Sequence, residues 1–295
     1  MEMKDLRIRL GSIRLEFRSK VPLVINEGLE FFFDKQEGIS PDIVVFVRKM
    51  DKKIIFDDLS CGEDLLLRYY RNDDGWFAAA KEGTKDAAVI TKYDSKFTTA
   101  VMYLNDKDFP GMLWNVAKLL QLFPIRQFLI QRNIFVLHSS RILYQEKAIL
   151  FTAPSKVGKS TQAQLWNKHE GAKIISNDRT LIEADQGLFT TYNFIVDGSA
   201  PVFGCYQAML GAVVVLRQAN QNKVTKLAGS RALKYMLEQC VFDSWEINER
   251  IQLQLLLLQL IERYPVYLLE CRPDEQAVHC LKQRLIRDGV FENEN

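Results

Sequence analysis

The segment that most constrains the fold is the run Ala153-Pro154-Ser155-Lys156-Val157-Gly158-Lys159-Ser160-Thr161, which follows an apolar stretch at 147–152. Its Gly-Lys-Ser ending is typical of the phosphate-binding (Walker A) loop between a strand and a helix. In such loops backbone N–H groups and the helix N-terminus face the phosphates, the lysine reaches them, and the following hydroxyl binds magnesium. An apolar strand pattern before the run and a helical pattern at 160–168 provide that context. We therefore predict nucleotide binding by the loop, and an ordinary strand-to-helix turn is the alternative.

Two positions of the loop depart from the usual pattern. Ala153 stands where glycine is commoner, and alanine fits there if its φ is negative. Lys156 also stands where glycine is common, which narrows the conformations open to the loop but adds a positive charge near phosphate.

The chain before the loop divides into a β-rich domain at 1–108 and the start of a second domain at 109–295. Alternating apolar and charged residues at 6–10 and 13–17 predict half-buried antiparallel strands, and 42–47 and 88–90 are further strand candidates. Asn72-Asp73-Asp74-Gly75 is a turn signal that could close a hairpin. No catalytic constellation is visible here, so we expect a platform or recognition domain.

The second domain has the alternation of strands and helices that is typical of α/β proteins. Helices are expected at 112–123, 125–131, 160–168, 230–238, 246–262 and 274–287. Strands are expected at 133–137 (ending at His138), 147–152, 173–175, 212–216 (a central strand) and 266–270. The predicted fold class is therefore α/β (α+β), with a β-rich N-terminal domain before the core that carries the loop.

Asp178 is the first candidate for chemistry beside the loop. It follows the predicted strand 173–175, so a parallel sheet would place it at the carboxyl edge next to Lys159. There it could bind magnesium or accept a proton, although Asn177-Asp178 is also a common turn pair. His138 ends the strand before the one that feeds the loop, and it is either catalytic or structural.

Other polar residues are weaker candidates. Arg179 could stabilise phosphate charge, and Asp197 and Ser199 flank a glycine that could approach a substrate. A surface arginine and a simple turn explain them equally well. His169 and His279, on helix-like stretches, are assigned to the surface or to packing.

Composition excludes several function classes. The net charge is +2 and basic residues are interspersed with acids, which argues against a nucleic-acid partner. No apolar run approaches the roughly 20 residues of a membrane span. The five cysteines are scattered and form no zinc-binding pattern. With a charged N-terminus that does not resemble a signal peptide, these features predict a cytoplasmic protein.

Three stretches together resemble a known family: 135–140 (FVLHSS), 148–161 (AILFTAPSKVGKST) and 175–179 (ISNDR). They are similar to the HPr serine kinase/phosphorylase group, and more closely to bacterial HPr-kinase-like proteins with a phosphoenolpyruvate-carboxykinase-type nucleotide-binding core. The stretch 267–278 also resembles those relatives. The resemblance implies an ATP-dependent kinase that uses Mg2+. It matches His138 to the family's histidine, and Asn177 and Asp178 to its acidic pair, of which one acid is here an asparagine.

Three functions are compatible with these residues. The first is a kinase that moves the γ-phosphoryl group of ATP to a hydroxyl of a protein, a peptide or a small molecule. In it Lys159 contacts phosphate, Ser160 binds magnesium, and Asp178 is the base or a second metal ligand. The second is a catalytically impaired nucleotide-binding regulator or partner protein. A structural module whose loop binds nothing is the third. The relatives also suggest assembly into a homo-oligomer.

Overall fold

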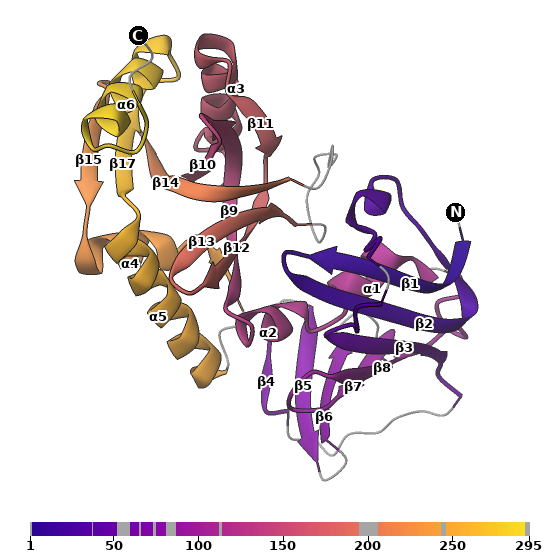
Figure 1. Cartoon of the computed structure of the whole chain (residues 1–295). Coiled ribbons are helices and arrows are strands. Elements are labelled where there is room, and N and C mark those ends of the chain that lie inside the picture. The colour runs from indigo at the N-terminus through magenta and orange to yellow at the C-terminus, as the bar shows by residue number, and fades with distance from the viewer. Residues whose placement is uncertain are drawn as a thin grey trace. The chain divides into compact units, whose positions relative to one another are not determined.

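The computed structural model describes residues 2–36, 38–51, 60–64, 66–72, 75–80, 87–111, 114–194, 206–242 and 246–292. The chain is a mixed α and β protein that divides into two compact units (Figure 1). Unit 1 comprises Met1–Leu129 and Asp243–Arg250, and unit 2 comprises Ile130–Phe242 and Ile251–Asn295. The chain therefore first passes from unit 1 to unit 2 after Leu129, whereas the sequence analysis placed the domain boundary between residues 108 and 109.

Unit 1 contains, in its described part, an eight-stranded sheet in the order β1-β2-β3-β8-β7-β6-β5-β4. The strands are β1 Glu2–Leu10, β2 Ile13–Val24, β3 Ile43–Lys49, β4 Gly62–Glu63, β5 Leu67–Asn72, β6 Gly75–Ala80, β7 Val89–Tyr93 and β8 Thr99–Leu104. The predicted antiparallel pair at the N-terminus is present as β1 and β2. The predicted hairpin is present between β5 and β6, where Asn72 pairs with Gly75. β3 pairs in parallel with both β2 and β8.

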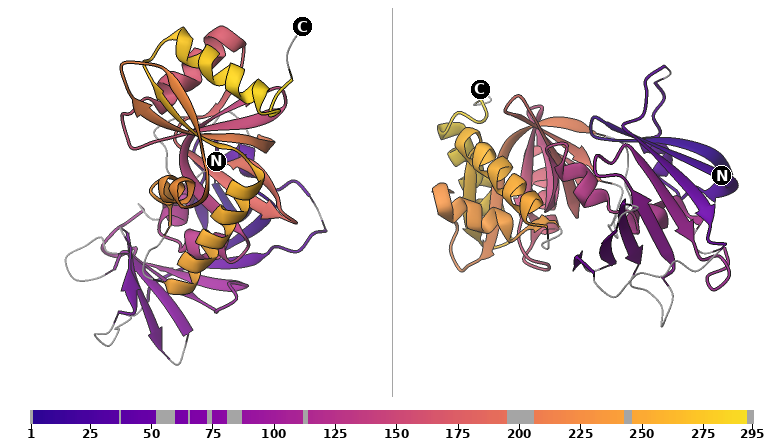
Figure 2. Two further views of the ribbon diagram at one scale, coloured as in Figure 1. Left: turned by 90° about the vertical axis from the view of Figure 1, so that its left-hand side faces the viewer. Right: turned by 90° about the horizontal axis from the view of Figure 1, so that it is seen from below.

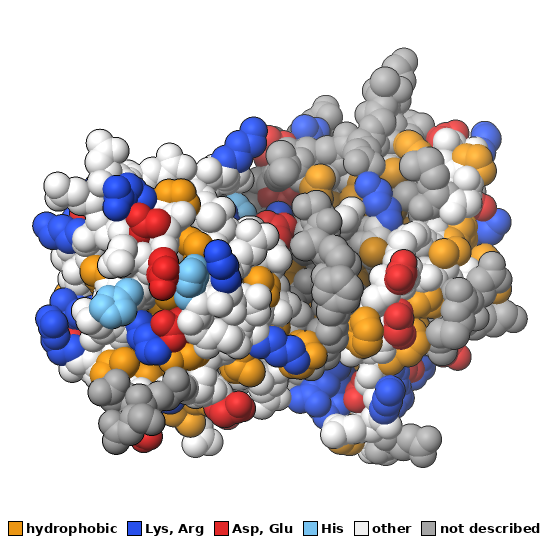
Figure 3. All heavy atoms as spheres, turned by 90° about the horizontal axis from the view of Figure 1, so that it is seen from above, with side chains coloured by type: hydrophobic (Ala, Val, Ile, Leu, Met, Phe, Trp, Pro, Cys, Tyr) orange, Lys and Arg blue, Asp and Glu red, His pale blue; other side chains and the backbone are white. Residues whose placement is uncertain are grey.

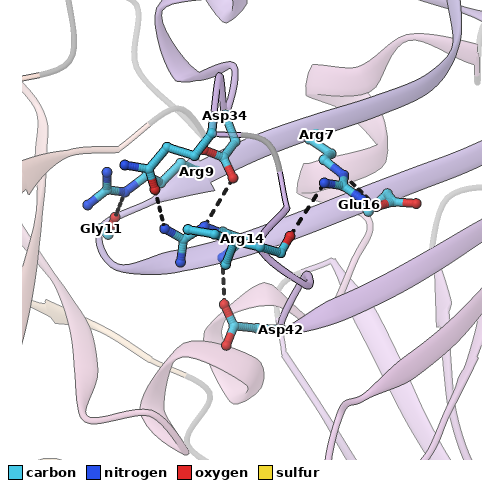
Figure 4. A network of polar contacts seen from close by, with 9 residues as sticks. Arg7, Arg9, Gly11, Arg14, Glu16, Asp34 and Asp42 are labelled. Carbon is cyan, nitrogen blue, oxygen red and sulfur yellow. Dashed lines mark hydrogen bonds and ion pairs between the residues drawn. The ribbon is translucent and has the colours of Figure 1, made fainter.

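The alternating pattern of the first hairpin separates a buried face from a charged one. Ile8 and Phe17 are fully buried, whereas the charged residues between such positions meet on the other face. Arg7 Nε donates to Glu16 Oε2 at 2.6 Å, and the Arg14 backbone N–H donates to Asp42 at 2.8 Å (Figure 4). The hairpin is thus held by apolar burial on one face and by ion pairs on the other.

The helical elements of the first part of the chain are short: η1 Leu29–Phe32, α1 Val116–Gln121 and α2 Ile125–Ile130. α1 is shorter than the predicted helix at 112–123, of which residues 112 and 113 lie outside the described chain. Asn115 explains the start of α1, because its side-chain oxygen accepts a hydrogen bond from the Lys118 backbone N–H at 3.1 Å. Such an N-cap satisfies a backbone donor that the first helical turn leaves without a partner.

Unit 2 contains, among the residues described, a nine-stranded sheet. Its strands are β9 Ile134–Tyr144, β10 Lys147–Thr152, β11 Lys173–Ser176, β12 Arg179–Asp185, β13 Leu188–Asn193, β14 Gln207–Gln218, β15 Lys223–Leu227, β16 Cys240–Val241 and β17 Val266–Cys271. β14 is central and runs parallel to both β10 and β17. β14 also pairs with β13. The strands β10, β9, β12, β13 and β14 therefore form a closed ring of pairings, which the β10–β14 pair completes.

Helices cover both faces of this sheet. α3 Lys159–Glu170 and α6 Glu275–Arg287 lie beside one another (Figures 1 and 2). They bury Trp166 and Leu281 against Phe151 of β10. The opposite face packs on α4 Gly229–Leu237 and α5 Ile247–Arg263, with Leu257 fully buried. β10, which leads into the predicted phosphate loop, is thus buried on both faces.

The structure corrects the sequence prediction at β9. The predicted strand end at His138 is wrong, because β9 continues to Tyr144. The polar residues beyond the predicted strand end are buried in the strand: Ser139 Oγ donates to Thr180 Oγ1 at 2.9 Å, and Arg141 is only 1% exposed. β11 also pairs with β9 in the antiparallel sense, so the parallel pairing expected for it is wrong. β12, β13 and β15 were not predicted.

The distribution of charges and the character of the helices bear on two expectations from the composition. Basic and acidic side chains are interspersed on the face seen in Figure 3, as a net charge of +2 with 39 basic and 37 acidic residues would suggest. None of the helices in the described part of the chain has the length and apolar character that a membrane crossing requires.

Candidate functional site

The predicted phosphate loop joins β10 to α3, as its sequence context indicated. Ala153 follows β10 directly, is fully buried, and belongs to the same apolar cluster as Phe151 and Ala163. It is not among the residues with a positive φ. Alanine therefore fits this position, and its methyl group anchors the start of the loop in the core.

The middle of the loop alternates in backbone handedness. Lys156 has φ 68° and Gly158 has φ 122°, whereas Ser155 and Val157 between and before them do not have positive φ. Such alternation turns successive N–H groups toward one side and creates a concavity that favours anions. The side chain of Lys156 is exposed. The loop therefore has the backbone form of an anion-binding nest next to the N-terminus of α3.

Lys159 is held at the base of this loop. Its side chain is nearly buried, and its Nζ donates to the Ala153 carbonyl at 2.9 Å and to the Pro154 carbonyl at 3.4 Å. Burial lowers the pKa of the lysine, and the charge of Asp178 acts in the opposite direction. The amine is thus folded against the loop and is electrostatically coupled to Asp178.

Asp178 reaches the loop through the pairing of β9. β11 and β12 both pair with β9, and Asn177 and Asp178 form the link between them. The Ser139 backbone N–H donates to the Asp178 carbonyl at 3.0 Å. On the other side of β9, Thr152 Oγ1 donates to the His138 carbonyl at 2.8 Å. The end of β10 and the β11–β12 link are therefore attached to neighbouring residues of one strand.

This attachment brings two of the predicted site residues into contact. His138 Nε2 lies 3.2 Å from Asp178 Oδ1, with both side chains partly exposed. Burial and then the charge of Lys159 lower the pKa of His138, while Asp178 opposes the shift. The imidazole therefore favours its neutral form near neutral pH, and its Nε2–H can donate a hydrogen bond to the carboxylate.

The hydroxyls predicted to serve the metal lie at the start of α3. Ser160 and Thr161 occupy the first turn of the helix and are exposed. Ser160 follows Lys159 directly, so the hydroxyl, the amine and the loop nest share one end of the helix. The hydroxyls of Ser160 and Thr161 and the carboxylate of Asp178 are oxygen donors of the kind that a hard cation prefers.

Asn177, which precedes Asp178 in the β11–β12 link, has structural contacts of its own. Its carbonyl accepts a hydrogen bond from Ser140 Oγ at 3.2 Å. Its side-chain oxygen is buried and has no hydrogen-bond partner among the described residues. A buried amide oxygen of this kind is unusual and has spare capacity for a donor. A charged carboxylate at this position would carry a larger desolvation cost.

Arg141, to which the sequence analysis assigned no role, lies in the interior of unit 2. Its guanidinium donates to Thr191 Oγ1 at 3.1 Å, to the Tyr206 carbonyl at 3.1 Å and to Asn193. Asn193 Nδ2 in turn donates to the carbonyl of Ile175 at 3.3 Å. Arg141 therefore ties β9, β13 and the residue before β14 to β11, shortly before Asp178. The signal in the sequence was an arginine directly before the apolar residues Ile142 and Leu143.

Of the remaining candidate residues, only Arg179 lies beside His138 in the described part of the chain. Arg179 opens β12 opposite His138, and its charge helps to lower the pKa of that histidine. Asp197 and Ser199 lie outside the described residues. His169 lies 3.6 Å from Glu275 of α6, and His279 lies 3.2 Å from Gln283 on the same helix. Both therefore belong to the helical layer, as expected.

Comparisons with known proteins show only a weak structural similarity. No protein-family model and no curated protein matches the chain. Among solved structures, the chain is similar to the HPr(Ser) kinase/phosphatase from Coxiella burnetii. The TM-score is 0.33 and the identity 8%, and the match covers 52% of this chain and 98% of that one. A likeness of this size does not establish a common fold, so the function has to be argued from the residues themselves.

Proposed function

We propose that the chain is an ATP-dependent phosphotransferase that moves the γ-phosphoryl group to a hydroxyl acceptor. The observation that carries this proposal is the convergence of Lys159, Asp178 and His138 beside the nest formed by the loop at 153–158. His138 and Asp178 are 3.2 Å apart, and Lys159 and Asp178 interact electrostatically. A phosphate cradle next to a carboxylate contains the parts that phosphoryl transfer requires.

The residues present fit a magnesium–nucleotide complex. The loop residues Ala153–Thr161 would hold the phosphates through backbone N–H groups. Lys159 would exchange its contacts with two loop carbonyls for phosphate oxygens. Ser160 and Asp178 would hold Mg2+, which neutralises phosphate charge when bound. The buried side-chain oxygen of Asn177 lies in the same link as Asp178 and has no hydrogen-bond partner among the described residues, so it has capacity for a donor there.

The carboxylate of Asp178 would receive the proton of the acceptor hydroxyl. A base for this step has to remain ionised and within reach of the hydroxyl. Lys159 lies near Asp178, and the two groups interact electrostatically. The neutral imidazole of His138 would fix the orientation of the carboxylate by donating a hydrogen bond, and Arg179 would add positive charge at the same edge.

The acceptor is proposed as a class only: a serine of a protein or peptide, or a small molecule with a hydroxyl group. The resemblance of 135–140, 148–161 and 175–179 to HPr-kinase-like proteins supports a kinase, with assembly into a homo-oligomer as a further expectation. It does not extend to the acceptor itself.

Release of labelled phosphate from γ-labelled Mg-ATP tests the catalytic part without knowledge of the acceptor, since water can replace it slowly. We expect turnover by the parent and a loss of about 100-fold or more in Asp178→Asn. Asp185→Asn, at the far end of β12, is the matched control and should keep the parent rate. Equal turnover by Asp178→Asn and the parent would remove Asp178 from the mechanism.

A nucleotide-binding regulator without catalysis is the second candidate, and one observation favours it. Asn177 stands where the related kinases have an acid, which leaves one carboxylate for both metal binding and proton transfer. The regulator predicts tight binding of Mg-ATP by calorimetry, with Lys159→Ala abolishing it, but no labelled phosphate release by the parent. Restoration of turnover by Asn177→Asp would identify the missing acid as the cause.

A further inference from the structure

A second candidate site lies on unit 1 and is independent of the proposed phosphotransfer. Residues of β1, β2, β3 and β8, together with Met50, Asp51 and Trp114, line a groove of about 1040 Å3. A smaller hollow of about 540 Å3 shares Asp5 and Arg18 with this groove, so the two are continuous. We call the combined hollow the sheet groove.

Cations dominate the charged lining of the sheet groove. The larger hollow is lined by four basic residues, Arg18, Lys20, Arg48 and Lys49, and by the acids Asp5 and Asp51. Lys49 is paired with Asp106 at 2.7 Å, and Arg18 is paired with Glu16. Arg48 and Lys20 have no acidic partner among the described residues. The sheet groove therefore has positive charge that the described part of the chain does not neutralise.

Aromatic rings hold these cations in place. The guanidinium carbons of Arg18 and Arg48 lie 5.9 and 5.7 Å from the centre of the Phe46 ring. Lys49 Nζ lies 6.0 Å from the ring of Trp114. Contacts of this kind restrict a long basic side chain while its N–H donors remain available. They also occupy ring faces on which a nucleic-acid base would have to stack.

We propose that the sheet groove binds an acidic polypeptide segment of a partner protein. Carboxylates are the natural ligands of arginine donors, which they meet in a bidentate geometry. The larger hollow reaches from Asp5 of β1 to Tyr103 of β8. Four strands spaced by about 4.8 Å extend over roughly 14 Å, which four or five residues of extended peptide would cross. The partly exposed apolar residues Val21 and Met50 in the lining would accept an apolar side chain between the acids.

Fluorescence anisotropy with a labelled peptide of alternating glutamate and leucine tests this proposal on the full chain. We expect saturable binding that weakens with salt, and no binding of the matched peptide with glutamine in place of glutamate. The double variant Lys20→Glu/Arg48→Glu should bind about tenfold or more weakly. Lys35→Glu, at an exposed site of unit 1 outside the groove lining, makes the same charge reversal as each single substitution and is the control, which should bind like the parent.

Several outcomes would overturn the proposal. An equal loss in Lys35→Glu would show general charge attraction rather than a site. Tighter binding of a labelled single-stranded oligouridine, lost in the same double variant, would make the groove a nucleic-acid site. No binding of the acidic peptide by the folded parent would remove the groove as a docking site. Both altered residues are exposed, and a melting curve like that of the parent establishes that the double variant is folded.

Discussion

His138 Nε2 lies 3.2 Å from Asp178 Oδ1, although one residue is inside β9 and the other lies in the link between β11 and β12. The contact depends on the register of β9, which pairs His138 with Arg179 and bonds Ser139 to the Asp178 carbonyl. A shift of one residue in that register would direct His138 to the opposite face of the sheet. The candidate site is therefore a product of strand pairing as much as of the loop.

The depressed pKa of His138 predicts a pH dependence of stability. Burial and the charge of Lys159 lower this pKa below its ordinary value of 6.5. The unfolded chain therefore binds the proton more readily than the folded chain. The stability contributed by the neutral imidazole is fully present above about pH 6.5 and is lost as the pH falls from that value through the lower pKa of the folded chain.

His138→Gln is accordingly expected to reduce the loss of stability on acidification. Urea unfolding at several pH values between about 5 and 8 measures it. His279→Gln, which alters an exposed histidine of α6, should retain the pH dependence of the parent. Identical slopes for His138→Gln and the parent would show that His138 titrates alike in the folded and unfolded chains.

The left-handed backbone at Lys156 predicts an unusual order of stabilities. With φ 68°, Lys156→Gly should be about 1 kcal/mol more stable than Lys156→Ala, because only glycine adopts this region without a steric cost. At Lys168, inside α3, the order should reverse, with glycine about 1 kcal/mol less stable than alanine. Denaturant unfolding of the four variants measures both differences. The same order at both positions would contradict the loop conformation.

The N-cap of α1 predicts a local stability effect. Asn115→Ala removes the acceptor for the Lys118 N–H and should cost about 1 kcal/mol. Asn115→Asp keeps an acceptor oxygen and should remain close to the parent. Thermal unfolding followed by circular dichroism compares the variants. A parent-like melting temperature for Asn115→Ala would argue that α1 begins elsewhere.

The sequence was informative where periodicity and loop chemistry were strong. The strand at 147–152, the loop and the helix after it were predicted, because an apolar run and a Gly-Lys-Ser ending constrain local structure directly. The central strand around 212–216 was recognisable for the same reason, since strands buried on both faces are continuously apolar.

The rest depends on contacts that one sequence does not encode locally. Ser139, Ser140 and Arg141 are polar and lie beyond the predicted strand end, yet hydrogen bonds to β12, the β11–β12 link and β13 allow their burial in β9. The predicted helix at 112–123 was too long, because the N-cap Asn115, and not the apolar spacing, sets the start of α1. The contact between His138 and Asp178 required the pairing of β9 with β12, which was not predicted at all.

The central claim is that the loop at 153–161 binds a nucleotide, and thermal stability with and without Mg-ATP tests it most directly. A ligand at about 100 times its dissociation constant should stabilise the folded parent by about 2.7 kcal/mol. The shift should vanish in Lys159→Ala and persist in Lys168→Ala, an exposed change on the same helix. A folded parent that shows no shift with Mg-ATP, or a shift that Lys159→Ala retains in full, would show that the loop at 153–161 does not bind the nucleotide as proposed.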